Sequence, residues 1–94
     1  MRVEWSLDAL SDLNDIATYI SQDNPRAAAL VIEKIFADVE RLTLFPAMGR
    51  EGRVIGTREW TVAKLSYVIP YRVKATHLQV LAIFHTRRCA PLKW

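Results

Sequence analysis

Two stretches of helical periodicity, separated by only a few residues, constrain the fold of this chain more than any other feature of its sequence. The first carries apolar residues at three- and four-residue intervals: Leu10, Leu13, Ile16, Ala17 and Ile20. The second carries a similar stripe: Ala28, Val31, Ile32, Ile35, Val39 and Leu42. Each stripe needs an apolar partner, and the short connection between them brings the two together. The sequence therefore predicts an antiparallel helix hairpin.

The ends of both helices carry residues that favour helix boundaries. Ser6 is a suitable N-cap for the first helix, and Asn24 followed by Pro25 is typical of the start of a second one. Phe45 precedes a proline, and a residue in that position avoids the helical region. We therefore expect helices of about four and five turns.

The rest of the chain changes to the two-residue period of strands. A short strand is expected at residues 2–5, and the segment 46–56, with all three glycines, is the only loop-like region. Three further strands are expected after it, at 57–62, 67–73 and 78–85. Pro70 lies inside the middle one, where we expect a bulge or an N–H position that faces no neighbour. The predicted fold is α+β, a β-α-α-β-β-β order with the helix hairpin packed on a small antiparallel sheet.

The last strand predicts a surface that needs a cover. If it alternates regularly, Leu78, Val80, Ala82 and Phe84 share one face, while Leu81, Ile83, His85 and Arg87 share the other. Both faces are then apolar through the middle, and one helix hairpin covers only one face of a small sheet. The second face would be covered by the C-terminal segment of the chain or by a partner.

Length and composition limit the classes of protein to consider. Ninety-four residues make one domain, 1–94, and residues 1–46 hold four basic against eight acidic residues, whereas residues 47–94 hold nine against two. This asymmetry favours a polyanionic or acidic partner for the second half, although the two halves also attract each other. No apolar stretch is long enough to span a membrane, no signal peptide is recognisable, and the single cysteine, Cys89, excludes an internal disulfide. We expect a cytoplasmic protein.

Basic and aromatic residues of the second half gather at strand ends and on one strand face: Arg58, Trp60, Arg72, Lys74, His85, Arg87, Arg88, Lys93 and Trp94. Guanidinium groups, an imidazole and aromatic rings suit the binding of a phosphodiester. The same groups suit an acidic protein, and any one of them also fits an ordinary ion pair or a solvated strand end. No nucleotide-binding fingerprint, metal site or cofactor site is recognisable, so none is expected.

An ordered series of short motifs carries a family resemblance. It runs from W-x-x-x-A-x-x-D-L-x-x-I-x-x-Y-I at 5–20 through NP-x-AA, FP-x-x-GR-x-G, GTRE and YVIPYRV to H-x-RR at 85–88. The series resembles the RelE/ParE superfamily of bacterial toxins from type II toxin–antitoxin modules. The resemblance covers nearly the whole chain and implies the same β-α-α-β-β-β fold. It also implies an antitoxin partner that covers the sheet. A higher-order toxin–antitoxin complex is compatible with the resemblance.

The superfamily divides by target, and the sequence favours the ParE-like branch, whose members inhibit DNA gyrase and are not nucleases. The long helix hairpin is typical of that branch, and Val68 stands where the nucleases tend to carry an arginine. The alternative is a RelE-like, ribosome-dependent endoribonuclease that cuts mRNA. A third hypothesis is a binding module that has lost toxicity.

Each hypothesis implies its own residues. For the ribonuclease, His85 or Glu59 would move the proton of the attacking 2′-hydroxyl, while Arg87 and Arg72 would stabilise the charge on the phosphorane. For the gyrase inhibitor, the predicted contact residues are Arg58, Trp60, Arg87, Arg88, Lys93 and Trp94. For the antitoxin, they are Leu81, Ile83, Trp60 and Arg72.

Overall fold

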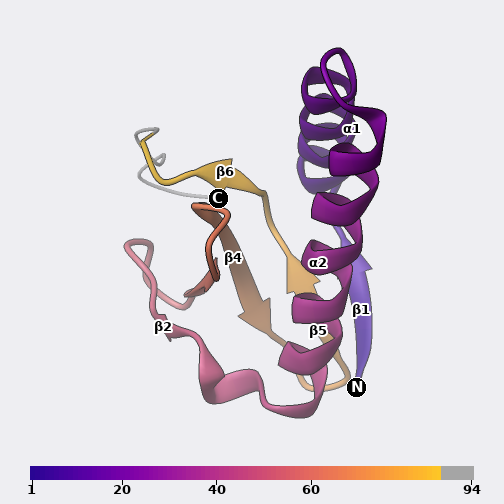
Figure 1. Ribbon diagram of the computed structural model, residues 1–94. Helices are drawn as coiled ribbons and strands as arrows, with labels where there is room; N and C mark the ends of the chain where they lie inside the picture. Colours follow the sequence, from indigo (N-terminus) through magenta and orange to yellow (C-terminus); the bar gives the residue numbers. More distant parts are fainter. Residues whose placement is uncertain (88–94) are drawn as a thin grey trace.

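The helix hairpin forms where the two apolar stripes predict it. α1 spans Leu7–Ser21 and α2 spans Pro25–Leu44, in a computed structural model that describes residues 1–87 (Figure 1). The two helices pack against each other, and α2 also contacts strands β1, β3 and β5 of the sheet. The hairpin therefore covers one face of the sheet, which we call the helix face.

Both predicted N-caps are confirmed. Ser6 Oγ accepts a hydrogen bond from the N–H of Ala9 (3.0 Å), and Asn24 Oδ1 accepts one from Ala27 (3.0 Å). The Ser6 hydroxyl also donates to the carbonyl of Leu81 (2.8 Å), which fixes the start of α1 to the far end of the chain.

Within residues 1–87 the sheet has six strands, in the order β1-β5-β4-β3-β2, with β6 also paired to β4. Its elements are β1 (Arg2–Trp5), a 3₁₀ turn η1 (Pro46–Met48), β2 (Arg50–Glu51), β3 (Arg58–Val62), β4 (Tyr67–Val73), β5 (His77–Val80) and β6 (Phe84–His85). The α+β class is confirmed. The sheet is mixed rather than wholly antiparallel, because β1 runs parallel to β5. The segment predicted as a loop also contains a short edge strand, β2.

The core lies between the hairpin and the helix face of the sheet. Its buried members come from both helices, from β3, β4 and β5, and from the segment that joins β5 to β6: Ala9, Leu13, Ile35, Val39, Leu42, Val62, Ile69, Tyr71, Leu78, Val80 and Ile83. The alternation predicted for β4 is confirmed, since Ile69 and Tyr71 lie in this core.

The predicted last strand is broken by a bulge opposite Pro70. Tyr71 pairs with Val80 and Val68 pairs with Phe84, so two residues of β4 face three residues, 81–83, of the other strand. The Pro70 carbonyl accepts the N–H of Leu81 (2.9 Å). Because the N and O of one strand residue point to the same neighbour, the missing N–H of Pro70 falls on this side, and the ladder breaks there.

The bulge corrects the expected faces of the last strand. One extra residue reverses the alternation, so Ile83 enters the core on the helix face and Phe84 pairs beside Val68 on the opposite face. Leu81 and Ile83 are 6% and 1% exposed. The expectation that these two side chains lie on an uncovered face is therefore wrong, and their predicted antitoxin contacts stay untested.

The opposite face of the sheet is also covered in its middle. Val68, Pro70 and Phe84 are buried there. The segment between β2 and β3 contributes to the cover, because Val54 is buried and the Arg53 guanidinium lies 5.5 Å from the centre of the Phe84 ring.

Candidate interaction site

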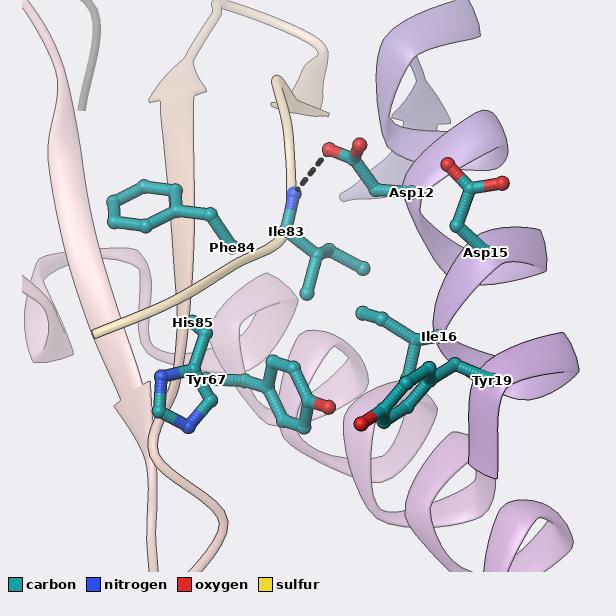
Figure 2. Close-up of a pocket in the computed structure, with 8 residues that line it drawn as sticks. All are labelled: Asp12, Asp15, Ile16, Tyr19, Tyr67, Ile83, Phe84 and His85. Carbon is teal, nitrogen blue, oxygen red and sulfur yellow. Dashed lines mark hydrogen bonds between the residues drawn. The ribbon is translucent and has the colours of Figure 1, made fainter. Parts of the chain in front are cut away.

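A cleft of about 420 Å³ opens on the helix side, between α1 and the ends of β4 and β6 (Figure 2). Its lining residues are Asp12, Asp15, Ile16, Tyr19, Tyr67, Ile83, Phe84 and His85. One wall is the acidic side of α1, the floor is apolar, and the other wall is aromatic. A cleft of this kind suits an apolar or aromatic side chain of a partner better than a phosphate, since carboxylates repel anions.

Aromatic rings line the cleft from both sides. Tyr19 projects from α1 and Tyr67 from the start of β4, and their hydroxyl ends point toward each other across the cleft (Figure 2). His85 stands edge-on to Tyr67, with 5.7 Å between ring centres. The Nδ1 atom of His85 accepts the N–H of Arg87 (3.2 Å), so a neutral imidazole carries its proton on Nε2.

The acidic wall holds the bulge in place. Asp12 Oδ2 accepts the N–H of Ile83 (2.9 Å), a group that the bulge turns away from β4 (Figure 2). A buried N–H without a partner would cost free energy, and the carboxylate removes that cost. Asp12 therefore positions the cleft, a role that no local pattern in the sequence indicates, because the N–H that it accepts belongs to Ile83 at the far end of the chain.

The opposite face carries a buried carboxylate among arginines, which we call the Glu59 cluster. Glu59 is 2% exposed and accepts the N–H of Arg53 (3.0 Å). The guanidinium groups of Arg50 and Arg53 lie 3.4 and 3.5 Å from its Oε1 atom. The Arg50 side chain is 65% exposed and the Arg53 side chain is 47% exposed. The cluster therefore presents two held guanidinium groups at the surface.

The Arg58 side chain makes hydrogen bonds within the fold. Its guanidinium donates to the carbonyl of Gly49 (2.8 Å), and the neighbouring Tyr71 hydroxyl donates to Pro46 (2.6 Å) while it accepts the N–H of Gly49 (3.0 Å). Burial raises the pKa of Tyr71, partly offset by the Gly49 hydrogen bond and the Arg58 charge. These contacts fix the turn η1 over the sheet.

Trp60 lies on the helix face, where it packs against the core. Its Nε1–H donates to Asp38 Oδ2 (3.0 Å), and the Asp38 side chain, almost fully buried on α2, also binds Lys34 Nζ (2.8 Å). Arg41 lies over the indole ring, 6.0 Å from its centre. Sequence reasoning missed Asp38, although its place between Ile35 and Leu42 on the apolar stripe marks an acidic residue at a core position.

The four residues predicted for ribonuclease chemistry do not form one group, although His85 and Arg87 are neighbours, with the N–H of Arg87 donating to His85 Nδ1. His85 pairs opposite Tyr67 and Arg72 opposite Gln79, so the two lie five β4 positions apart, about 17 Å, and on opposite faces. Glu59 is buried, and Arg87 is exposed beyond β6. Three further predicted contact residues, Arg88, Lys93 and Trp94, lie outside the described residues.

Residues 1–87 contain neither a candidate metal site nor a candidate membrane span. No group of three or more histidine, cysteine, aspartate or glutamate side chains in this range is placed to hold a metal ion. No helix within it is long and apolar enough to cross a membrane.

The fold and these surfaces define a small α+β interaction protein with a helix hairpin on a mixed sheet. The family model described as "ParE toxin of type II toxin-antitoxin system, parDE" matches residues 3–89. The chain belongs to this family of type II toxin–antitoxin toxins. The predicted ParE-like assignment within the RelE/ParE superfamily is therefore confirmed.

Individual relatives agree with this assignment. A curated protein of Sinorhizobium fredii (strain NBRC 101917 / NGR234), named "Putative toxin Y4kP", is 40% identical over 90 residues, which are 96% of this chain and 93% of that protein. A solved structure, "Chromosomal ParDE TA system from P. aeruginosa", matches with a TM-score of 0.80 at 28% identity and covers 90% of this chain and 95% of that chain. The structure of the RelBE2 toxin–antitoxin complex of Mycobacterium tuberculosis matches with a TM-score of 0.57 at 26% identity. The match covers 89% of this chain and 95% of that chain. The stronger likeness to the ParDE structure favours the ParE-like branch over the RelE-like one.

Proposed function

We propose that this toxin inhibits DNA gyrase by binding it and does not cut mRNA. Membership of the ParE family favours a gyrase target, in line with the resemblance noted in the sequence. One structural observation carries the choice against the nuclease: the residues predicted for RNA cleavage are divided between the two faces of the sheet. Gyrase acts on the bacterial chromosome, so this target implies a cytoplasmic location.

RNA cleavage through the 2′-hydroxyl needs a proton acceptor and a phosphate-binding cation within a few ångströms of one phosphate. His85 and Arg72 are on opposite faces of the sheet and about 17 Å apart along β4. Glu59 accepts hydrogen bonds from Arg53 and is almost closed to solvent. His85 and Arg87 are neighbours, but Arg72 and Glu59 lie on the other face, so the four predicted groups do not surround one phosphate.

The exposed cations fit the role of contact residues. Arg50 and Arg53 are held by Glu59 with their side chains largely or half exposed, and Arg87 is exposed beyond β6. Guanidinium groups fixed by a buried carboxylate lose little freedom when they bind an acidic surface. The Glu59 cluster and Arg87 are therefore the groups that we propose contact gyrase.

A supercoiling assay tests this proposal. Purified gyrase, ATP and relaxed plasmid are incubated with increasing amounts of the toxin, and we expect supercoiling to fall at toxin amounts comparable to gyrase. His85→Ala should still inhibit gyrase, because His85 has no catalytic role in this account. Arg53→Gln should weaken inhibition several-fold.

A translation reaction provides the complementary measurement. The same toxin preparation, added to ribosomes that translate a defined mRNA, should leave the mRNA uncut. Normal supercoiling together with cut mRNA would reverse the proposal and favour the ribonuclease.

We also propose that an antitoxin binds and neutralises this chain. The solved relatives are toxin–antitoxin systems or complexes, and the basic second half of the chain suits an acidic segment. Co-expression with the product of the adjacent gene should restore growth and yield a complex that purifies through either protein. Growth arrest that persists, with no complex recovered, would contradict this partner.

A further inference from the structure

β1 is the terminal strand of the sheet, and its outer edge has no strand beside it within the described residues. It pairs with β5 on one side only, and Figure 1 shows it at the side of the molecule away from β2. A strand edge with unpaired backbone groups is a ready site for another strand.

The direction of the backbone groups along this edge follows from one hydrogen bond. The N–H of Ser6 donates to the carbonyl of Val80 (3.0 Å), so Ser6 faces β5. Because the N–H and C=O groups of a strand alternate between its two neighbours, Glu4 and Arg2 face β5 as well. Val3 and Trp5 therefore direct their N–H and C=O groups to the open edge.

The sequence of this edge is complementary to itself. When two copies of residues 1–5 are placed antiparallel with Val3 opposite Val3, Arg2 of each copy faces Glu4 of the other, and Met1 faces Trp5. The two Val3 residues then exchange their outward N–H and C=O groups, as the central hydrogen-bonded pair of an antiparallel ladder requires. We propose that a second copy of this chain pairs here, so that the toxin forms a twofold dimer through its β1 edge.

Side chains on the helix face suit the same partner. A cleft of about 310 Å³ follows this edge, between β1 and α2, and its lining includes Met1, Val3, Trp5 and Phe36. Phe36 stands edge-on to Trp5 with 5.2 Å between ring centres, yet it is 46% exposed, and Met1 is 48% exposed. In the dimer Met1 of one copy meets Trp5 and Phe36 of the other, a favourable sulfur–aromatic arrangement.

The charged pair lies on the other face and is available. Arg2 is exposed, and the Glu4 side chain is 55% exposed. Glu4 Oε1 accepts a hydrogen bond from Gln79 Nε2 (3.1 Å), and Glu4 Oε2 lies 3.4 Å from His77 Nε2. Each dimer would gain two Arg2–Glu4 cross-strand pairs, and like charges in these places oppose association.

A reciprocal charge exchange tests the dimer, with sedimentation equilibrium of the purified toxin from about 5 to 500 µM as the measurement. Arg2→Glu and Glu4→Arg each place like charges opposite each other twice, so each should weaken dimerisation by about tenfold or more. The double variant restores opposite charges and should associate within about threefold of the unmodified chain. Val3→Pro should also weaken the dimer, because it removes an N–H that the dimer ladder uses. The monomer does not use this N–H, so its fold should be retained.

Two controls keep the result specific. Glu51→Arg makes the same charge change as Glu4→Arg but on β2, at the other edge, and should leave the association constant unchanged. Circular dichroism should show the same helix content for all variants. A chain that is monomeric over the whole range overturns the proposal, and so does a dimer that neither single charge exchange weakens.

Discussion

The two faces of the sheet each bury one carboxylate, but with different partners. On the helix face, Asp38 is held by the indole of Trp60 and by Lys34 and sits among apolar side chains. On the opposite face, Glu59 is held by the backbone of Arg53 and by the guanidinium groups of Arg50 and Arg53, which reach solvent.

This difference indicates different roles for the two faces. The partners of Asp38 lie at the contact between α2 and β3, so this carboxylate joins the helix hairpin to the sheet. The side-chain partners of Glu59 are the long arginine side chains of Arg50 and Arg53, and Glu59 holds their guanidinium groups at the surface. We therefore expect substitutions on the helix face to reduce stability most, and substitutions in the Glu59 cluster to affect binding more than folding.

The largest effect is expected for Ile83→Ala. Ile83 is 1% exposed and belongs to the helix-face core, so its truncation should lower the free energy of unfolding by about 3 kcal/mol. Ile55→Ala is a matched control, because Ile55 is 97% exposed and should cost close to nothing. Urea denaturation measures the free energy of unfolding of both variants. Equal values would contradict the burial of Ile83 in the core and would favour the regular strand that the sequence predicted.

The next effect is expected for Asp38→Ala. The substitution leaves the Trp60 Nε1–H without its acceptor on the helix face, and should cost about 2 kcal/mol in urea denaturation. Asp38→Asn keeps an oxygen for the indole and should lose less. If the two variants are equally destabilised, the hydrogen bond to Trp60 is not the important contact.

Tyr71→Phe should cost about 1.5 kcal/mol at neutral pH, because the Tyr71 hydroxyl makes two hydrogen bonds to the η1 turn. Burial raises the folded-state pKa of Tyr71 above its ordinary value of 10.0, so the folded state holds the phenolic proton more tightly than the unfolded state. This contribution is present below about pH 10 and is lost as the pH rises through the folded-state pKa. The stability difference between the two proteins, followed from pH 8 to 12, should shrink; a constant difference would contradict the assignment.

The smallest effect on stability is expected for Glu59→Gln. The amide oxygen still accepts the N–H of Arg53, and the exposed arginines regain hydration, so we expect a loss below about 1 kcal/mol. Inhibition of gyrase should fall more clearly, by several-fold, because the guanidinium groups are no longer held. A large loss of stability with unchanged inhibition would remove the contrast between the two faces.

The first half of the fold could be predicted from the sequence because its signals are local. Helical spacing, Ser6, Asn24 and Pro25 define the hairpin within a few residues of chain. The predicted strands β3 and β4 formed for the same reason, since two-residue alternation and the flanking turns are visible in the sequence.

The last strand could be predicted only in part because its bulge depends on a distant residue. Pro70 signals an irregular ladder, but the sequence does not say whether the break falls on β4 or on the strand beside it. The positions of Ile83 and His85 both depend on that choice, and so does the candidate site. The partners of Asp38 and Glu59 are likewise set by tertiary packing, which no local pattern records.

One culture tests the central claim, that this toxin acts through gyrase and not on mRNA. Expression is induced in bacteria without the antitoxin, and plasmid topology and the integrity of abundant mRNAs are followed together over the first minutes. Our account predicts loss of negative supercoiling with induction of the DNA-damage response while the mRNA stays intact. Rapid mRNA cleavage with unchanged plasmid topology would contradict it, and normal growth with abundant folded protein would show that the chain has lost toxicity.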